Sequence, residues 1–181
     1  SIAGAYQAEW GKDEIDIANS LLGYKLTLAK LPYTGLHVPS GTEIVMEGKI
    51  LQDKTHPEWM VEMLQTYDHH RLQPIFELDS LYYRNNPIFH DVLSGYSEHR
   101  LLMGMPIESK LNGELKKVFP QTKHVSMTNG GCNWLHAVVQ IKKKTNSDPK
   151  KIIKKTFELH RSLKQVTVVD EDIDPNNAES V

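Results

Sequence analysis

The sequence predicts a mixed α/β protein in two parts, mainly β over residues 1–105 and a small α/β layer over residues 106–181. Apolar and polar residues alternate in the first part, whereas apolar residues recur at helical spacing from Pro106 onward. Prolines, glycines and asparagines interrupt the first part at turn positions. A chain of 181 residues can form one ample domain or two small ones, each with its own core.

A short helix is expected near the start of the chain. Its apolar residues fall on one helical face, at Ile15, Ala18, Leu21 and Leu22. Asp13 can accept hydrogen bonds from the free N–H groups of the first turn, and Gly23 stands where a C-terminal glycine is favoured. These signals predict both ends of the helix.

Alternating segments then predict the strands of one antiparallel sheet or barrel. They cover residues 26–28, 43–51, 75–83 and 101–105. The second part begins with a helix between Pro106 and Pro120 and continues with strands at 124–128 and 134–142. A helix that starts at Asp148 and a strand at 166–169 complete an α/β layer, with the lysines of 142–144 and 150–155 on solvated faces.

Net charge, cysteine count and hydropathy limit which kinds of binding partner the sequence predicts. The net charge of −2 is spread along the chain, so we expect neither nucleic acid nor an anionic membrane as a partner. Cys132 is the single cysteine, which excludes an intrachain disulfide and is typical of the cytoplasm. No apolar run approaches the roughly 20 residues that span a bilayer, so we expect no stable membrane insertion. The chain starts at Ser1 rather than methionine, and we expect a fragment of a longer protein.

Glu58 and Glu62 form the first candidate for chemistry. Both carboxyls lie in a segment that also holds Trp59, Met60 and Val61. An apolar setting favours the protonated form of a carboxyl, which a general acid near neutral pH requires. By spacing alone, two glutamates four residues apart more often form the solvated edge of a helix, so the pattern leaves both interpretations open.

Three other clusters have simpler explanations. His69 and His70 beside Asp68 could bind a metal, but adjacent histidines point apart. The segment 129–132, Asn-Gly-Gly-Cys, could bind an anion or hold a thiol nucleophile, and a turn between strands explains it equally well. The acids of 170–174 lack the pattern of a calcium loop and suit an exposed turn.

Several segments, taken together and in order, resemble the UbiD family of carboxy-lyases. Residues 38–48 resemble the family's "VPA-x-AEIVLEG" strand, and residues 11–14 precede it at the "VSE" helix start. Residues 72–74 and 84–90 resemble the "PV…TxRxDPIYH" segment. Residues 129–142 and 164–174 resemble the "EGCxxxxAVVxIKK" and "KxVxVVDxDID" signatures. The resemblance runs nearly from end to end.

The resemblance implies the later half of a split β-barrel of the flavin-reductase-like type, followed by a small C-terminal α/β domain. Family members remove carbon dioxide from aromatic or α,β-unsaturated acids with prenylated FMN as an electron sink, and a glutamic acid then returns a proton. The resemblance also implies Mn²⁺, K⁺, a flavin prenyltransferase as cofactor supplier, a homo-oligomer, and a role in quinone or isoprenoid biosynthesis.

Three kinds of cofactor-side residue follow from this resemblance. Glu14 resembles the glutamate that binds the divalent metal, and Lys164 resembles the lysine at the flavin phosphate. Ala3, Gly4 and Tyr6 fall near the cofactor-side loop whose carbonyls hold the monovalent cation. The family's arginine and its asparagine and histidine ligands lie upstream of this chain, so the chain alone should lack a complete site.

The acid network departs from the family pattern "EGPFGE". Alignment from Thr66 places Glu62 on the second acid and Pro57 on the first, with Glu58 one residue away. Either Glu58 takes the first acid's place, or the chain is a non-catalytic or regulatory subunit that binds flavin or a partner chain. A plain flavin-reductase-like barrel is a third interpretation, but it leaves the C-terminal signatures unexplained.

Overall fold

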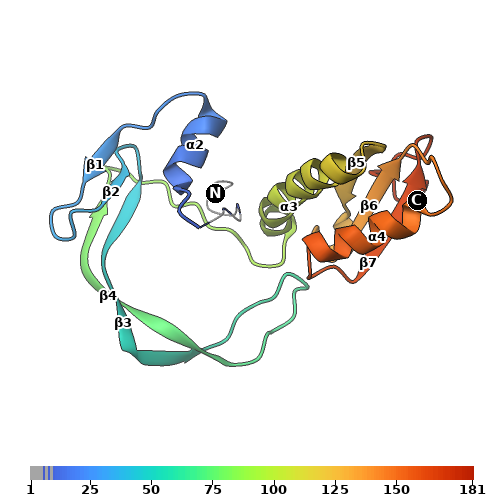
Figure 1. Ribbon diagram of the computed structural model, residues 1–181. Helices are drawn as coiled ribbons and strands as arrows, with labels where there is room; N and C mark the ends of the chain where they lie inside the picture. The colour runs from blue at the N-terminus through green and yellow to red at the C-terminus, as the bar shows by residue number, and fades with distance from the viewer. Residues whose placement is uncertain (1–5, 7, 9) are drawn as a thin grey trace. The chain divides into compact units, whose positions relative to one another are not determined.

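The computed structural model describes Tyr6, Ala8 and residues 10–181, and Figure 1 shows its helices and strands. Its contacts divide the chain into two compact units. One unit is Lys12–Ser94, and the other is Gly95–Val181 with the few described residues that precede Lys12. The boundary expected between residues 105 and 106 falls inside a helix, α3 (Ser97–Val118), so the units divide before this helix begins.

The first unit opens with α2 (Glu14–Leu22), and both of its predicted ends are confirmed. The Asp13 carboxylate accepts a hydrogen bond of 2.8 Å from the Ile15 N–H. Gly23 has a φ of 72°, a left-handed conformation that glycine adopts without a steric penalty. The sequence therefore specified this helix locally.

The strands of this unit form two separate antiparallel pairs. β1 (Leu28–Lys30) pairs with β2 (His37–Pro39), and β3 (Ile44–Glu58) pairs with β4 (Arg71–Tyr83). The strands predicted at 43–51 and 75–83 are confirmed as parts of the longer β3 and β4. The expectation of one sheet is wrong for the described residues, which also form no closed barrel. Alternation marks a strand, but it does not say which strands pair.

Glu47 is the most deeply buried carboxylate of this unit, with 2% of its surface exposed. It accepts hydrogen bonds from the Tyr33 and Thr34 N–H groups, the Thr34 hydroxyl and the Tyr82 hydroxyl. Burial acts to raise the pKa of Glu47, but these hydrogen bonds outweigh it and hold the pKa below the ordinary value. Glu47 thereby ties the loop between β1 and β2 to the β3–β4 hairpin.

Residues 101–105 are helical, so the strand predicted there is wrong. They lie in the first turns of α3, and Pro106 lies inside this helix rather than at its start. A short apolar run fits a strand and a buried helix equally well, because local periodicity does not separate them. Packing of α3 against the sheet of the second unit decides for the helix.

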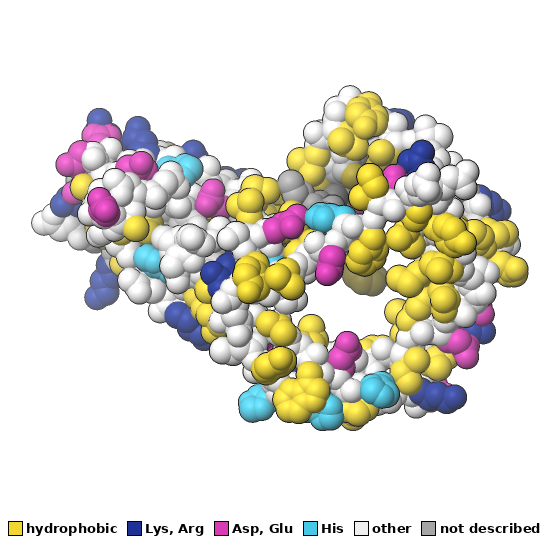
Figure 2. Space-filling model, turned by 180° about the vertical axis from the view of Figure 1, so that it is seen from behind, with side chains coloured by type: hydrophobic (Ala, Val, Ile, Leu, Met, Phe, Trp, Pro, Cys, Tyr) yellow, Lys and Arg dark blue, Asp and Glu magenta, His cyan; other side chains and the backbone are white. Residues whose placement is uncertain are grey.

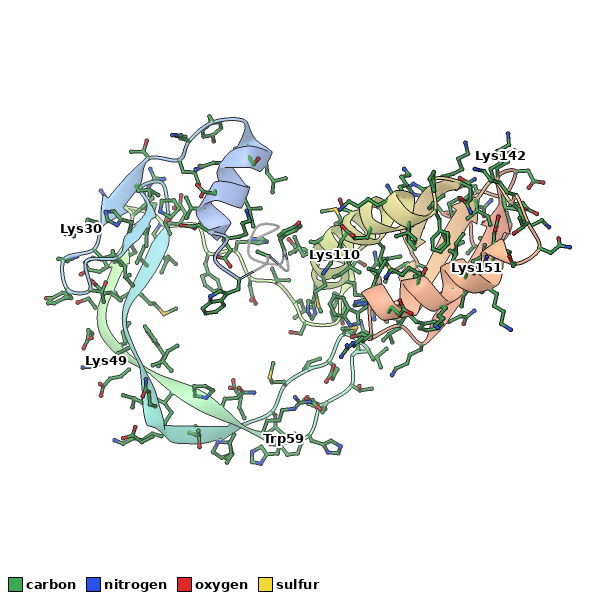
Figure 3. The ribbon with its side chains drawn as sticks, in the orientation of Figure 1. Lys30, Lys49, Trp59, Lys110, Lys142 and Lys151 are labelled. Carbon is green, nitrogen blue, oxygen red and sulfur yellow. The ribbon has the colours of Figure 1, made fainter. Side chains whose placement is uncertain are left out.

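The second unit is the predicted α/β layer. Its sheet has the order β5-β6-β7, with β5 (Thr122–Met127) antiparallel and β7 (Gln165–Asp170) parallel to β6 (His136–Ile141). The helices α3 and α4 (Asp148–Leu159) lie against one face of this sheet (Figure 1). Their shared core includes Leu111, Leu115, Val125, Val139 and Ile152, each at most 1% exposed. The expected lysines, Lys142 and Lys151 among them, are exposed (Figure 3), except Lys155, which is half-buried.

None of the helices in the described part of the chain combines the length and the apolar character needed to cross a membrane.

Candidate functional site

Glu58 and Glu62 lie at the far end of the β3–β4 hairpin. Glu58 is the last residue of β3, is exposed, and pairs with Arg71 across the ribbon. Glu62 is half-buried and belongs to a tight turn, where its N–H donates to the Thr66 carbonyl at 2.7 Å and its carbonyl accepts from the Gln65 N–H at 2.9 Å. The two acids are therefore on a strand end and a turn, and neither lies on the helical edge that their spacing allows.

Aromatic side chains surround these acids at the tip of the hairpin. Trp59 stacks on His70 with ring centroids 5.0 Å apart and meets Tyr67 edge-on at 6.4 Å. Trp59 nevertheless remains 65% exposed, and Figure 3 shows it at the end of the ribbon. The tip thus carries exposed apolar side chains in the same segment as the two carboxyls, whose role as an acid pair stays a prediction.

The expected metal ligand Glu14 is the first residue of α2, and its side chain is exposed. Among the described residues its carboxylate makes no hydrogen bond, so its oxygens are free to bind a hard cation. Tyr6 is 43% exposed, while Ala3 and Gly4 lie outside the described residues. Within the described part of the chain, no three histidine, cysteine, aspartate or glutamate side chains gather as a metal site.

Lys164 stands immediately before β7 in the second unit, with an exposed side chain. Its N–H donates to the Leu135 carbonyl at 2.8 Å, and the Gln165 N–H donates to the same oxygen at 3.1 Å. An exposed ammonium on a backbone fixed in this way suits a phosphate group. Glu14 and Lys164 belong to different units.

The Asn-Gly-Gly-Cys segment is a turn between β5 and β6, as expected. Asn129–Gly131 forms one turn of 3₁₀ helix, and the Thr128 side chain accepts from the Gly131 N–H at 3.1 Å. Cys132 is buried, and both Cys132 and Asn133 have a positive φ, an uncommon conformation outside glycine. A buried thiol in a rigid turn does not suit a nucleophile.

His136 follows this turn at the start of β6. Its Nδ1 lies 3.0 Å from the Thr128 hydroxyl, and its Nε2 lies 3.0 Å from the Thr167 hydroxyl. Burial lowers the pKa of His136 below its ordinary value, so the neutral ring is favoured. The ring thus links β5, β6 and β7 on the face of the sheet away from the helices.

The same face carries a cavity of about 420 Å³. Polar groups from the sheet, the turn and the chain's final segment line it, among them Ser126, Thr128, Asn129, His136 and Asn176. Val138 and Pro175 contribute its apolar wall. The acids of 170–174 form an exposed turn near it, and the Gln140 amide donates to the carbonyls of Glu171 and Ile173.

Family models match both parts of the chain. The model of the 3-octaprenyl-4-hydroxybenzoate carboxy-lyase Rift-related domain matches residues 1–97, and the model of the carboxy-lyase C-terminal domain matches residues 100–181. The chain therefore belongs to the UbiD family of carboxy-lyases, and the resemblance found in the sequence is confirmed.

Curated relatives point to a particular decarboxylase. The chain is 43% identical over 172 residues to the anhydromevalonate phosphate decarboxylase of Methanocaldococcus jannaschii, covering 95% of this chain and 40% of that protein. It is 38% identical to the enzyme of the same name from Methanothermobacter thermautotrophicus, covering 93% of this chain and 40% of that protein. The chain thus spans about 40% of the length of these relatives.

A solved structure matches the whole fold. The UbiD-class enzyme HmfF of Pelotomaculum thermopropionicum, in an evolved dimeric form in complex with prFMN, aligns with a TM-score of 0.95 and 33% identity. The alignment covers 99% of this chain and 42% of that chain. The same enzyme has also been solved in complex with FMN.

The sequence did not single out three hydrogen-bonded polar residues that join segments distant in the chain. Glu47, His136 and His160 are at least half-buried polar residues with partners far along the chain. One signal was available for His160, because it continues the buried stripe of α4 at the spacing of Ile152 and Thr156. For Glu47 and His136 the partners depend on strand pairing, which local sequence does not reveal.

Proposed function

We propose that this chain is part of a prenylated-FMN-dependent decarboxylase of an unsaturated acid, and that the acid is anhydromevalonate phosphate. The observation that carries the proposal is 43% identity over 95% of the chain to a decarboxylase of that name. The prFMN complex of HmfF, at 33% identity, supports the cofactor. Since the chain spans about 40% of these relatives, the activity is proposed for the whole protein.

We assign the β part of the chain, which ends before α3, to the later half of a split β-barrel, and the part that begins with α3 to the C-terminal domain. The β3–β4 hairpin supports the barrel, because apolar side chains along it stay exposed (Figure 2), including Met46, Ile50, Leu72, Phe76 and Leu81. A two-stranded hairpin is marginally stable by itself in water. Strands from elsewhere in the whole protein would cover these side chains.

The described residues suit the phosphate end of the cofactor. Lys164 would meet the flavin phosphate as a point charge, and Glu14 would bind a divalent ion such as Mn²⁺. Tyr6, with Ala3 and Gly4, would belong to the loop at the cofactor that holds K⁺. When bound, the prenylated flavin supplies the electron sink for decarboxylation. The remaining ligands would come from outside this chain.

Glu62 is the proposed general acid. When the bond to the carboxylate breaks and carbon dioxide leaves, the carbon left behind must receive a proton. Glu62, half-buried within the apolar tip, would donate it, and Glu58 at the end of β3 would take the place of the family's first acid.

A second candidate is a non-catalytic or regulatory subunit that binds flavin or a partner chain. One observation favours it: Pro57 occupies the place of the family's first acid, and Glu58 is exposed at the strand end. This subunit would retain flavin binding and release no carbon dioxide.

The proposal also covers the oligomeric state of the whole protein, its compartment and the source of its cofactor. We place the whole protein in the cytoplasm as a homo-oligomer, with a flavin prenyltransferase as cofactor supplier. The dimeric form of HmfF supports assembly, and the single cysteine supports a reducing compartment.

The test uses the protein made from its complete gene and co-expressed with a flavin prenyltransferase. We expect the absorbance of a bound flavin and carbon dioxide release from anhydromevalonate phosphate. Glu62→Gln should lower kcat by about 100-fold or more, because its amide cannot donate a carboxyl proton. Glu77→Gln, on the same hairpin, removes an exposed carboxylate paired with Lys49 and should leave kcat unchanged. Flavin binding without carbon dioxide release would instead support the non-catalytic subunit.

A further inference from the structure

We propose that His160 is a positioning residue for Lys164, acting through the Trp134–Leu135 backbone. The inference rests on the proposed function, in which Lys164 meets the flavin phosphate. All four residues belong to the second unit, so the inference depends on contacts within one compact body.

The Leu135 carbonyl oxygen is the direct support of Lys164. It accepts hydrogen bonds from two successive N–H groups, at 2.8 Å from Lys164 and 3.1 Å from Gln165. Lys164 is exposed, and its side chain makes no hydrogen bond or ion pair among the described residues. The position of its ammonium group therefore depends on the backbone beneath it.

Leu135 is itself held by the turn between β5 and β6. Its N–H donates to the Gly131 carbonyl at 2.7 Å, and the Trp134 N–H donates to the same carbonyl at 3.0 Å. From the other side, α3 meets the turn closely, because a Cβ at Gly104 would lie 2.6 Å from the Asn133 Cβ and 2.7 Å from its carbonyl oxygen. The turn has little freedom to shift.

His160 fastens the segment that carries Lys164 to this turn. Its Nε2 lies 3.1 Å from the Trp134 carbonyl oxygen, and since a carbonyl only accepts, Nε2 must carry the proton. The imidazole also meets the Trp134 ring edge-on with centroids 4.5 Å apart, and His160 is only 7% exposed. The chain between His160 and Lys164 is thus anchored at both ends to adjacent residues, Trp134 and Leu135.

The chain between His160 and Lys164 is short, so a displacement at His160 should also displace the backbone of Lys164. The Leu163 N–H donates to the His160 carbonyl at 3.3 Å, and the Leu163 side chain is buried in the core. Losing the His160 hydrogen bond would release one anchor four residues before the lysine. A shift of about 1 Å in a binding group is enough to weaken the recognition of a ligand.

The test compares FMN with riboflavin, which lacks the phosphate, by titrating the flavin fluorescence of the protein made from its complete gene. His160→Phe keeps an aromatic ring and removes the donor, and should weaken FMN binding about 10-fold while changing riboflavin binding less than about twofold. His160→Gln retains a donor and should restore most of the FMN affinity. Thr156→Val, which removes a buried hydroxyl from the same helix, is the matched control and should affect neither ligand.

Lys164→Met separates the inference from the proposed function. Lys164→Met should weaken FMN binding and leave riboflavin binding unchanged. Adding His160→Phe to Lys164→Met should cause no further loss of FMN affinity, because both substitutions remove the same interaction with the phosphate. If Lys164→Met spares FMN, the phosphate assignment of the proposed function fails. The positioning role of His160 is overturned if Lys164→Met weakens FMN binding but His160→Phe does not. It is also overturned if His160→Phe weakens the binding of FMN and riboflavin equally. Should His160→Phe fail to fold, His160→Met, which also lacks the donor, replaces it in the same titration.

Discussion

The two units of this chain bury their apolar residues to very different degrees. In the second unit, α3 and α4 close over one face of a three-stranded sheet, and core residues such as Leu115 and Val139 are fully buried. In the first unit the long hairpin leaves Ile50, Leu72 and Phe76 exposed, and its most buried large side chain is the carboxylate of Glu47. The α/β layer is thus stabilised by its own core, whereas the described hairpin leaves apolar side chains exposed and buries the hydrogen-bonded carboxylate of Glu47.

The largest expected effect tests this difference directly. Leu115→Ala creates a cavity in the core of the second unit and should lower its free energy of unfolding by about 3 kcal/mol. In the 181-residue chain by itself, Leu81→Ala changes a residue of β4 that is 51% exposed and should cost less than about 1 kcal/mol. Hydrogen exchange of the β6 and β4 amides, resolved by peptide, measures each unit. Equal losses in the two variants would contradict the comparison.

An intermediate effect comes from two glycines of α3. Gly104→Ala drives a methyl group against Asn133 and should lower stability by about 1–3 kcal/mol. Gly113→Ala places the same methyl group in open space within the same helix and should raise stability by about 1 kcal/mol. Thermal unfolding should therefore shift in opposite directions for the two variants. If both variants shift the unfolding temperature in the same direction, the contact between Gly104 and Asn133 does not determine which residue α3 tolerates at this position.

The smallest expected effect is a local loss of stability at acid pH, and it compares one hydrogen-bonded carboxylate in each unit. In the second unit, hydrogen bonds from the Thr145 side chain and from the Thr145 and Lys144 N–H groups lower the pKa of Asp148 to about 2. In the first unit, the pKa of Glu47 is also lowered, because its hydrogen bonds outweigh burial. Each folded pKa lies below the unfolded value, 3.8 for Asp148 and 4.5 for Glu47, so the unfolded chain takes up the proton first.

The stabilisation is therefore complete above these unfolded values and is lost as the pH falls through the lowered pKa of each carboxyl. Hydrogen exchange is measured between pH 5 and pH 2 in steps of about one pH unit. As the pH falls, the amides of the β1–β2 loop should lose protection as Glu47 is protonated, and those of the 142–148 loop as Asp148 is protonated. Glu47→Gln and Asp148→Asn should each remove the pH dependence of their own loop only. A loop that keeps its pH dependence in its own variant would exclude that carboxyl as the cause.

Much of the second unit and the opening helix could be predicted from sequence because their signals are local. Asp13 and Gly23 mark the two ends of α2, and the spacing of Leu111 and Leu115 marks the buried face of α3. The β–α–β order at the end of the chain also indicated the layer correctly. The family signatures added Lys164 and Glu62 as site residues, and their roles stay predictions until the flavin titration and the kinetic test.

Only the tertiary structure decided which distant residues meet. Residues 101–105 fit a strand or a helix locally, and in the fold they belong to α3, whose later residues Ile107, Leu111 and Leu115 pack in the core. Glu47 finds partners 13, 14 and 35 residues away, and His160 finds the Trp134 carbonyl 26 residues before it. Such pairs depend on strand register and on helix placement, which many residues set together. The sequence by itself determined the elements and the family, and the folded chain determined which polar groups are held in place for chemistry.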